Sequence, residues 1–251
     1  MKKNYYHFIF SIGGACSCAS VLIRKGLRKS SGPFDWIAGS DFIARSEFLT
    51  TDFNHFLDKE DLIPMNQNNG DTNNLCDVYL NNRNQLIFNH DFPTGIPFNE
   101  SYPIILQKYR RRIKRLFKNI RTSPKVLLVF IEPPHQKKNF SVADLSKSME
   151  KIQNTFPDTQ IDLLYLTNCD KSEARTEYIN NHITRIHANY ASAKKDAPPH
   201  SVNTKKLNQL LNPYRLEQPF SDLIIWWTKK ILINMIPHKV YRNRLKDKYH
   251  Y

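Results

Sequence analysis

The sequence lacks the patterns that mark membrane-spanning, zinc-binding and disulfide-stabilised proteins. It has no run of eighteen consecutive apolar residues, so no helix that crosses a bilayer is expected. Its four cysteines show no Cys-x-x-Cys spacing and have no histidines at zinc-ligand intervals. These absences predict a protein of a reducing, cytoplasmic setting that holds neither a metal nor a cofactor.

Acidic residues are few relative to basic ones. The 251-residue chain has 37 Lys and Arg against 23 Asp and Glu, a formal net charge of +14 at pH 7. Such an excess predicts an anionic partner, which is nucleic acid, an anionic membrane surface, or an anionic small-molecule or glycan substrate. Nucleic acid is disfavoured because no recognition motif accompanies the charge and aromatic residues are not interleaved with it. The oligomeric state is not predicted.

The order of the expected elements predicts an α/β domain over residues 1–212. Apolar runs at 8–12, 125–131, 161–167 and 183–186 have the composition of buried strands, and helical periodicity falls between them. Strands that alternate with helices form mostly parallel sheets with helices on both faces, a three-layer architecture. Ligands bind such sheets at the carboxyl ends of the strands.

Cys16 is the candidate nucleophile. The apolar run at 8–12 is broken by Gly13 and Gly14, and apolar residues then recur at helical spacing. Cys16 therefore falls at or just before the first turn of a helix, where unpaired backbone N–H groups favour an anion. This position predicts a lowered pKa for the thiol. The alternative is a small buried cysteine packed under the sheet.

Two further short segments contain candidate site residues. Asp35 lies between two aromatic residues, one of them Trp36, and is either a helix cap or the buried partner of a histidine or arginine. His90 and Asp91 are expected at the end of a strand at 86–88. A histidine in that position can enter a cleft as a base, although a hydrogen-bonded structural role is the alternative.

Glu132 and His187 each follow, directly or nearly so, an expected strand of the parallel sheet. Together with Cys16 and His90 they are expected at its carboxyl edge. The pattern of residues 102–121 predicts a helix with one apolar stripe and with basic residues, but no acidic ones, on its other faces. This basic surface is either solvated or a contact for phosphate or anionic lipid. The substrate-binding candidates are therefore Trp36, Arg110, Arg111, Arg112, Glu132 and His187.

The C-terminal segment, 213–251, differs in character from the rest. From Phe220 to Tyr251 it is apolar with paired tryptophans and flanking lysines, and then basic after Pro237. Such an amphipathic and basic composition is typical of attachment to an anionic membrane surface, here the inner face of the cytoplasmic membrane. Packing as a last helix and a dimer contact are the alternatives.

Four motifs together resemble the bacterial family of papain-like cysteine peptidases. Ser-Ile-Gly-Gly-Ala-Cys-Ser-Cys-Ala at 11–19 is similar to the family's opening, and Leu-Arg-Lys-Ser-Ser-Gly-Pro-Phe-Asp-Trp at 27–36 to its most distinctive run. Phe-Asn-His-Asp-Phe at 88–92 and the basic helix at 108–115 complete the resemblance. The chain departs from the family at Ala15, commonly Asn, and at Glu132, where the strand usually ends in Arg.

The resemblance implies a Cys–His site in which Cys16 is the nucleophile, His90 the base, and Asp35 or Asp91 the orienting group. Family members often accompany genes for surface polysaccharides, which implies a role in glycan assembly. The first hypothesis is thus a hydrolase or acyltransferase that acts through Cys16. The others are a membrane-surface glycosyltransferase or phosphosugar transferase, with the basic helix binding phosphate, and a non-catalytic partner in a polysaccharide-assembly complex.

Overall fold

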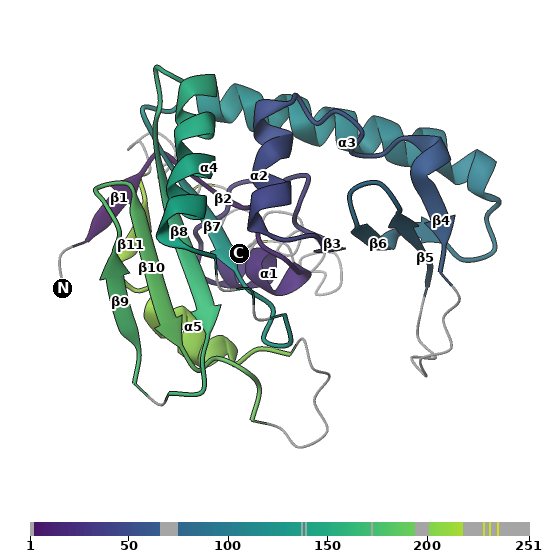
Figure 1. The fold of residues 1–251 in the computed structure, drawn as a ribbon. Helices are drawn as coiled ribbons and strands as arrows, with labels where there is room; N and C mark the ends of the chain where they lie inside the picture. The colour runs from purple at the N-terminus through teal and green to yellow at the C-terminus, as the bar shows by residue number, and fades with distance from the viewer. Residues whose placement is uncertain are drawn as a thin grey trace.

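The computed structural model describes residues 3–65, 75–136, 138, 140–171, 173–193 and 201–217, together with 228, 231 and 235. Over these residues the chain forms a mixed α/β fold with sheets of five, four and two strands (Figure 1). The expected α/β class is thereby confirmed, and so is the helix that begins at Cys16.

The helices are α1 (Cys16–Arg24), α2 (Phe42–Thr50), the short 3-10 helix η1 (Lys59–Asp61), α3 (Phe98–Arg121), α4 (Val142–Thr155) and α5 (Thr204–Leu210). The strands are β1 (Asn4–Tyr6), β2 (Phe8–Ser11), β3 (Ile37–Gly39), β4 (Leu62–Pro64), β5 (Cys76–Asn81), β6 (Leu86–Pro93), β7 (Lys125–Ile131), β8 (Gln160–Asn168), β9 (Arg175–Tyr178), β10 (Ile183–Ala188) and β11 (Tyr214–Leu216).

The five-stranded sheet has the order β2-β7-β8-β10-β9, and its first four strands are parallel. The near-continuous apolar sequence of β7 suits a strand that is covered on both faces. Leu128 and Phe130 pack into a cluster with residues of α2, α3 and α4. Leu127 and Val129 pack into a second cluster with residues of α1 and α5. Because successive side chains of a strand point to opposite faces, these clusters lie on the two sides of the sheet.

The four-stranded sheet, of order β3-β6-β5-β4, is antiparallel and was not expected. In it β6 extends through His90 to Pro93, so His90 lies within a strand and not after one at 86–88. Strand β6 belongs to a different sheet from β2, the strand that precedes Cys16, so the expectation that His90 lies at the carboxyl edge of the parallel sheet is wrong. Helix α3 packs against the small sheet, with the rings of Phe88 and Tyr109 5.7 Å apart, and runs across toward the large one (Figure 1).

The last described strand, β11, pairs in parallel with β1, and its Tyr214 is buried. The first residues of the predicted C-terminal segment therefore pack on the α/β unit. The amphipathic stretch from Phe220 to Tyr251 lies outside the described residues apart from positions 228, 231 and 235. Within the described residues, no helix has both the length and the apolarity that spanning a bilayer requires.

Candidate active site

The turn that leads into Cys16 is held by close backbone packing. A Cβ atom at Gly13 would lie 2.5 Å from Cys18 Cβ, and one at Gly14 would lie 2.8 Å from Pro133 Cδ. Real Cβ atoms do not approach so closely, so both positions need glycine. The turn therefore passes directly over the residues that follow β7 and begins α1 at Cys16 in a fixed position.

The Cys16 side chain is half-buried at the first residue of α1. The backbone N–H groups of Cys16 and Ser17 interact with the sulfur and lower its pKa, as expected at a helix start. Burial has the larger effect, and the net pKa of the Cys16 thiol is raised. The predicted lowering is therefore wrong, because covering the first turn of the helix removes water from the thiolate. A reaction at neutral pH needs a base to take the thiol proton.

Cys18 occupies a different environment although it is only two residues away. Its side chain is fully buried, and Sγ donates to the carbonyl oxygen of Val129 at 3.4 Å. Burial raises the pKa of the Cys18 thiol to about 12. Of the two cysteines in the motif, Cys16 is half-buried and Cys18 is fully buried.

Arg45 of α2 connects the Cys16 turn to β3. Its side chain is fully buried, and within the described residues all its hydrogen bonds go to backbone carbonyl groups. Nε and Nη2 donate to Gly39 at 3.1 and 2.7 Å, and Nη2 also donates to Ile37 at 2.9 Å. Nη1 donates to Gly13 in the turn. Burial lowers the pKa of Arg45 to about 9, so the guanidinium remains charged at neutral pH.

Sequence reasoning missed Arg45, although a signal for it exists. The residue lies three positions after Phe42 and four before Leu49, both of which are buried. It therefore shares the core-facing stripe of α2. A single cation on such a stripe next to a Gly-rich turn indicates that backbone carbonyl groups need a donor there.

His90 is exposed on β6 and contacts Trp36 edge-on, with ring centroids 6.2 Å apart. The structure thus brings together these two predicted site residues. Among the described residues, His90 makes no side-chain hydrogen bond, and none joins it to Cys16. The two are linked through β3, because Ile37, which accepts from Arg45, pairs with Phe88 of β6.

Neither predicted orienting carboxylate contacts His90 in the described structure. Asp91, its neighbour on β6, is buried and accepts from Tyr109 Oη at 2.6 Å and from Lys108. Adjacent residues of a strand point to opposite faces, so Asp91 is directed toward α3 and away from His90. The role of an orienting group stays a prediction for both Asp35 and Asp91.

Asp35 is not a helix cap, the first of the two roles expected for it, because the residues that follow form β3. Its buried carboxylate accepts from the Gly32 N–H at 2.6 Å and pairs with Arg28, so the arginine alternative is confirmed. Burial raises the pKa of Asp35 to about 6, although Arg28, Arg112 and Arg115 all act to lower it.

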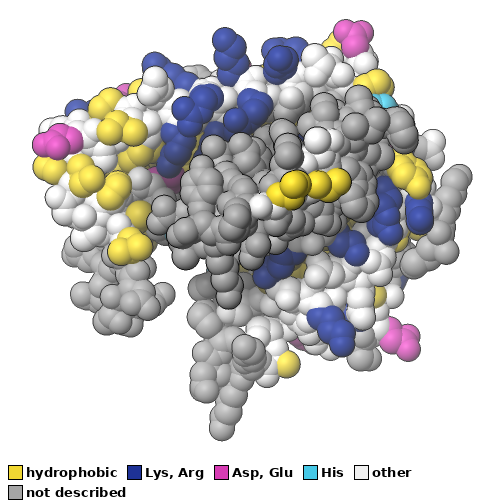
Figure 2. All heavy atoms as spheres, turned by 180° about the vertical axis from the view of Figure 1, so that it is seen from behind, with side chains coloured by type: hydrophobic (Ala, Val, Ile, Leu, Met, Phe, Trp, Pro, Cys, Tyr) yellow, Lys and Arg dark blue, Asp and Glu magenta, His cyan; other side chains and the backbone are white. Residues whose placement is uncertain are grey.

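The three predicted arginines of α3 do not converge on one site. The guanidinium of Arg112 lies over the ring of Tyr109, 5.5 Å from its centroid, and its charge acts to lower the pKa of Asp35. Arg111 is exposed. Arg110 lines a separate pocket that His55 also lines. Lys and Arg side chains are prominent on the rear face, where few acidic ones are visible (Figure 2). Sequence reasoning missed Arg115, which donates to Ser31 O at 2.6 Å.

Glu132 lies after β7 as predicted and is buried. Its Oε1 accepts from the Lys138 backbone N–H at 2.7 Å and from Tyr165 Oη at 3.5 Å. It lines a cavity of about 640 Å³. His187 is not among the residues lining this cavity; it pairs with Thr167 at 2.8 Å and with Glu177 at 3.3 Å.

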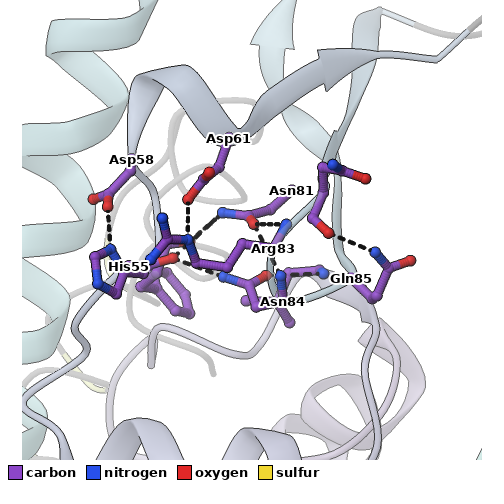
Figure 3. Close-up of polar contacts among 10 residues, drawn as sticks. His55, Asp58, Asp61, Asn81, Arg83, Asn84 and Gln85 are labelled. Atoms are coloured by element: carbon purple, nitrogen blue, oxygen red, sulfur yellow. Dashed lines mark hydrogen bonds and ion pairs between the residues drawn. The ribbon is translucent and has the colours of Figure 1, made fainter.

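One group of side chains has the composition of a metal site. The ligand atoms of His55, Asp58 and Asp61 lie within 4.8 Å of one another. Asp58 pairs with His55 at 2.6 Å, and Asp61 pairs with Arg83 at 3.0 Å (Figure 3). Both carboxylates are thus engaged by side chains of the protein, and we assign no ion to the group.

Fold and site together define a mixed α/β protein in which β2, the edge strand of the five-stranded sheet, leads through a glycine turn to a half-buried cysteine at a helix start. A family model described as "Putative papain-like cysteine peptidase (DUF1796)" matches residues 7–168, and the chain belongs to this family. The predicted family relationship is thereby confirmed. The match includes Cys16, Asp35, His90 and Glu132 and ends with β8. No curated protein and no solved structure matches the sequence.

Proposed function

We propose that the protein is a cysteine hydrolase of the peptidase class, with Cys16 as the nucleophile and His90 as the general base. The observation that carries the proposal is the half-buried Cys16 at the first residue of α1, where the backbone N–H groups of Cys16 and Ser17 favour the thiolate and so act to lower its pKa against the larger effect of burial. In the proposal, this helix belongs to the predicted three-layer arrangement of a sheet between helices. The close packing of Gly13 and Gly14 and the hydrogen bond from Arg45 to Gly13 fix the turn that positions Cys16.

The chemistry follows from the state of the thiol. Because burial raises the pKa of Cys16, the thiol keeps its proton until a base removes it. His90 takes this proton while the sulfur attacks a substrate carbonyl carbon, which requires the imidazole to come within about 3 Å of the sulfur. The N–H groups at the start of α1 stabilise the oxyanion.

Collapse of the tetrahedral intermediate breaks the bond to the leaving group and forms a thioester on Cys16. The leaving amine or alcohol receives the proton from the His90 imidazolium. His90 then takes a proton from water, which attacks the thioester and releases a carboxylic acid and the free thiol. A hydroxyl acceptor in place of water would make the same site an acyltransferase, and the surface-glycan setting stays a prediction from the resemblance.

The test is turnover of a fluorescence-quenched peptide library by the full-length protein. Cys16→Ser and His90→Ala should each reduce hydrolysis by at least about a hundredfold. Cys76→Ser is the matched control and should leave the rate unchanged, since Cys76 lies on β5. Full activity of Cys16→Ser would overturn the proposal.

A further inference from the structure

A cavity of about 640 Å³ adjoins the Cys16 turn. Its lining comes from the residues after β7, the start of α2, and the turn between β5 and β6 that includes Asn84 and Gln85 (Figure 3). Pro133 and Phe130 belong to the lining, and a Cβ at Gly14 would meet them at 2.8 and 3.5 Å. The cavity wall and the turn that places Cys16 are therefore in direct contact.

The inner wall of the cavity is aromatic. Tyr165 stacks on Phe130 with centroids 5.1 Å apart and meets Phe140 edge-on at 6.5 Å, and all three residues line the cavity. Aromatic faces and edges suit the methylene stem of a long side chain and tolerate a cation at its end.

The carboxylates of Glu132 and Asp41 are part of the same lining. Burial raises the pKa of the Tyr165 hydroxyl, and the charges of Glu132 and Asp41 raise it further. Of the two carboxylates, that of Glu132 lies 3.5 Å from Tyr165 Oη, at the aromatic wall. Glu132 is 3% exposed and is the most buried of the charged groups that line the cavity. Its acceptor contacts with Lys138 N and Tyr165 Oη fix the carboxylate in place.

The cations at the rim are already paired with carboxylates of the protein. Lys138 Nζ lies 2.7 Å from Asp41 Oδ2, and Arg83 Nε lies 3.0 Å from Asp61 Oδ2. The Lys138 side chain is 60% exposed, so its ion pair with Asp41 is weak and exchangeable. The protein's own ammonium group thus lies where an incoming cation would pair.

We propose that this cavity binds an ammonium or guanidinium group of the substrate, as on a lysine or arginine side chain, and that Glu132 and Asp41 determine this specificity. The cation displaces Lys138 from Asp41, and the aromatic wall packs on the methylene stem. The inference rests on the proposed function, because the cavity serves as a substrate pocket only if Cys16 is the reacting group.

Binding of acetyl-arginine amide, measured by calorimetry on the Cys16→Ser protein, tests the proposal independently of turnover. The neutral isostere acetyl-citrulline amide should bind at least about tenfold more weakly, because it lacks the charge-assisted hydrogen bond. Glu132→Gln should weaken arginine binding by a similar factor. Glu47→Gln, an exposed site on α2, is the charge-matched control and should leave binding unchanged.

Lys138→Met provides a second variant that does not touch the buried carboxylate, and it should tighten arginine binding by removing the competing ammonium group. Equal binding of arginine and citrulline amides, or preferential binding of acetyl-glutamate amide, would overturn the proposal. If arginine binds as predicted while Cys16→Ser retains full hydrolysis, the cavity is a cation-binding site, but the proposed reaction at Cys16 fails.

Discussion

Replacing Arg45 with methionine should destabilise the protein and disturb the Cys16 turn. Methionine fills much of the buried stem but cannot donate to the carbonyl groups of Gly13, Ile37 and Gly39. Each buried acceptor that loses its donor costs about 1–3 kcal/mol. Relief from burying the guanidinium charge offsets part of this loss. We therefore expect the free energy of unfolding to fall by about 3 kcal/mol.

Urea unfolding followed by tryptophan fluorescence measures this change. Arg111→Met is the matched control, because Arg111 is exposed on α3, and it should shift stability by less than about 0.5 kcal/mol. Arg45→Lys keeps the charge but presents one donor group in place of a planar fork, so it should fall between methionine and wild type. A loss below about 1 kcal/mol for Arg45→Met would refute the view that three carbonyl groups depend on this side chain.

Three further predictions concern stability. Burial raises the pKa of Asp35 from 3.8 to about 6, so the protonated carboxyl group favours the folded state. This stabilisation is lost as the pH rises from 4 through 6. Thermal melts should therefore show the stability of the wild type falling relative to that of Asp35→Asn over this interval. Hydrogen bonds from Arg185 and His187 lower the pKa of Glu177 from 4.5 to about 2. Its stabilisation is therefore complete above pH 4.5 and lost as pH falls toward 2, and acid unfolding of Glu177→Gln should lack it. Gly14→Ala should cost about 1–3 kcal/mol in urea unfolding because its Cβ would meet Pro133, and wild-type stability would contradict that packing.

The large sheet was predictable because its strands are encoded locally. The run at 125–131 is apolar at almost every position, which indicates a strand covered on both faces, and the structure has β7 there. Gly13 and Gly14 likewise placed the turn before α1. The small sheet was not predicted in full, because the sequence suggested that His90 and Asp91 are polar residues that follow a strand. Both in fact lie within β6, where His90 is exposed to solvent and Asp91 is buried against α3.

The site chemistry was less predictable because it depends on burial. The helix start at Cys16 correctly implied backbone N–H groups that lower the thiol pKa. The burial that raises this pKa overall depends on tertiary packing, which the local sequence does not indicate. The same holds for Asp35, whose arginine partner Arg28 comes from the preceding loop. The place of Arg45 on the core-facing stripe of α2 was readable from the sequence, but its partners were not, because backbone carbonyl groups have no sequence signature.

Acylation of Cys16 by an activated ester, followed by intact-protein and peptide mass spectrometry, tests the central claim most directly. The account predicts that p-nitrophenyl acetate acylates Cys16 well ahead of Cys76 and Cys169, and that His90→Ala slows acylation of Cys16 by about 10²–10⁴-fold while leaving the other thiols unchanged. Acylation of Cys16 at the same rate with and without the His90 imidazole would contradict it.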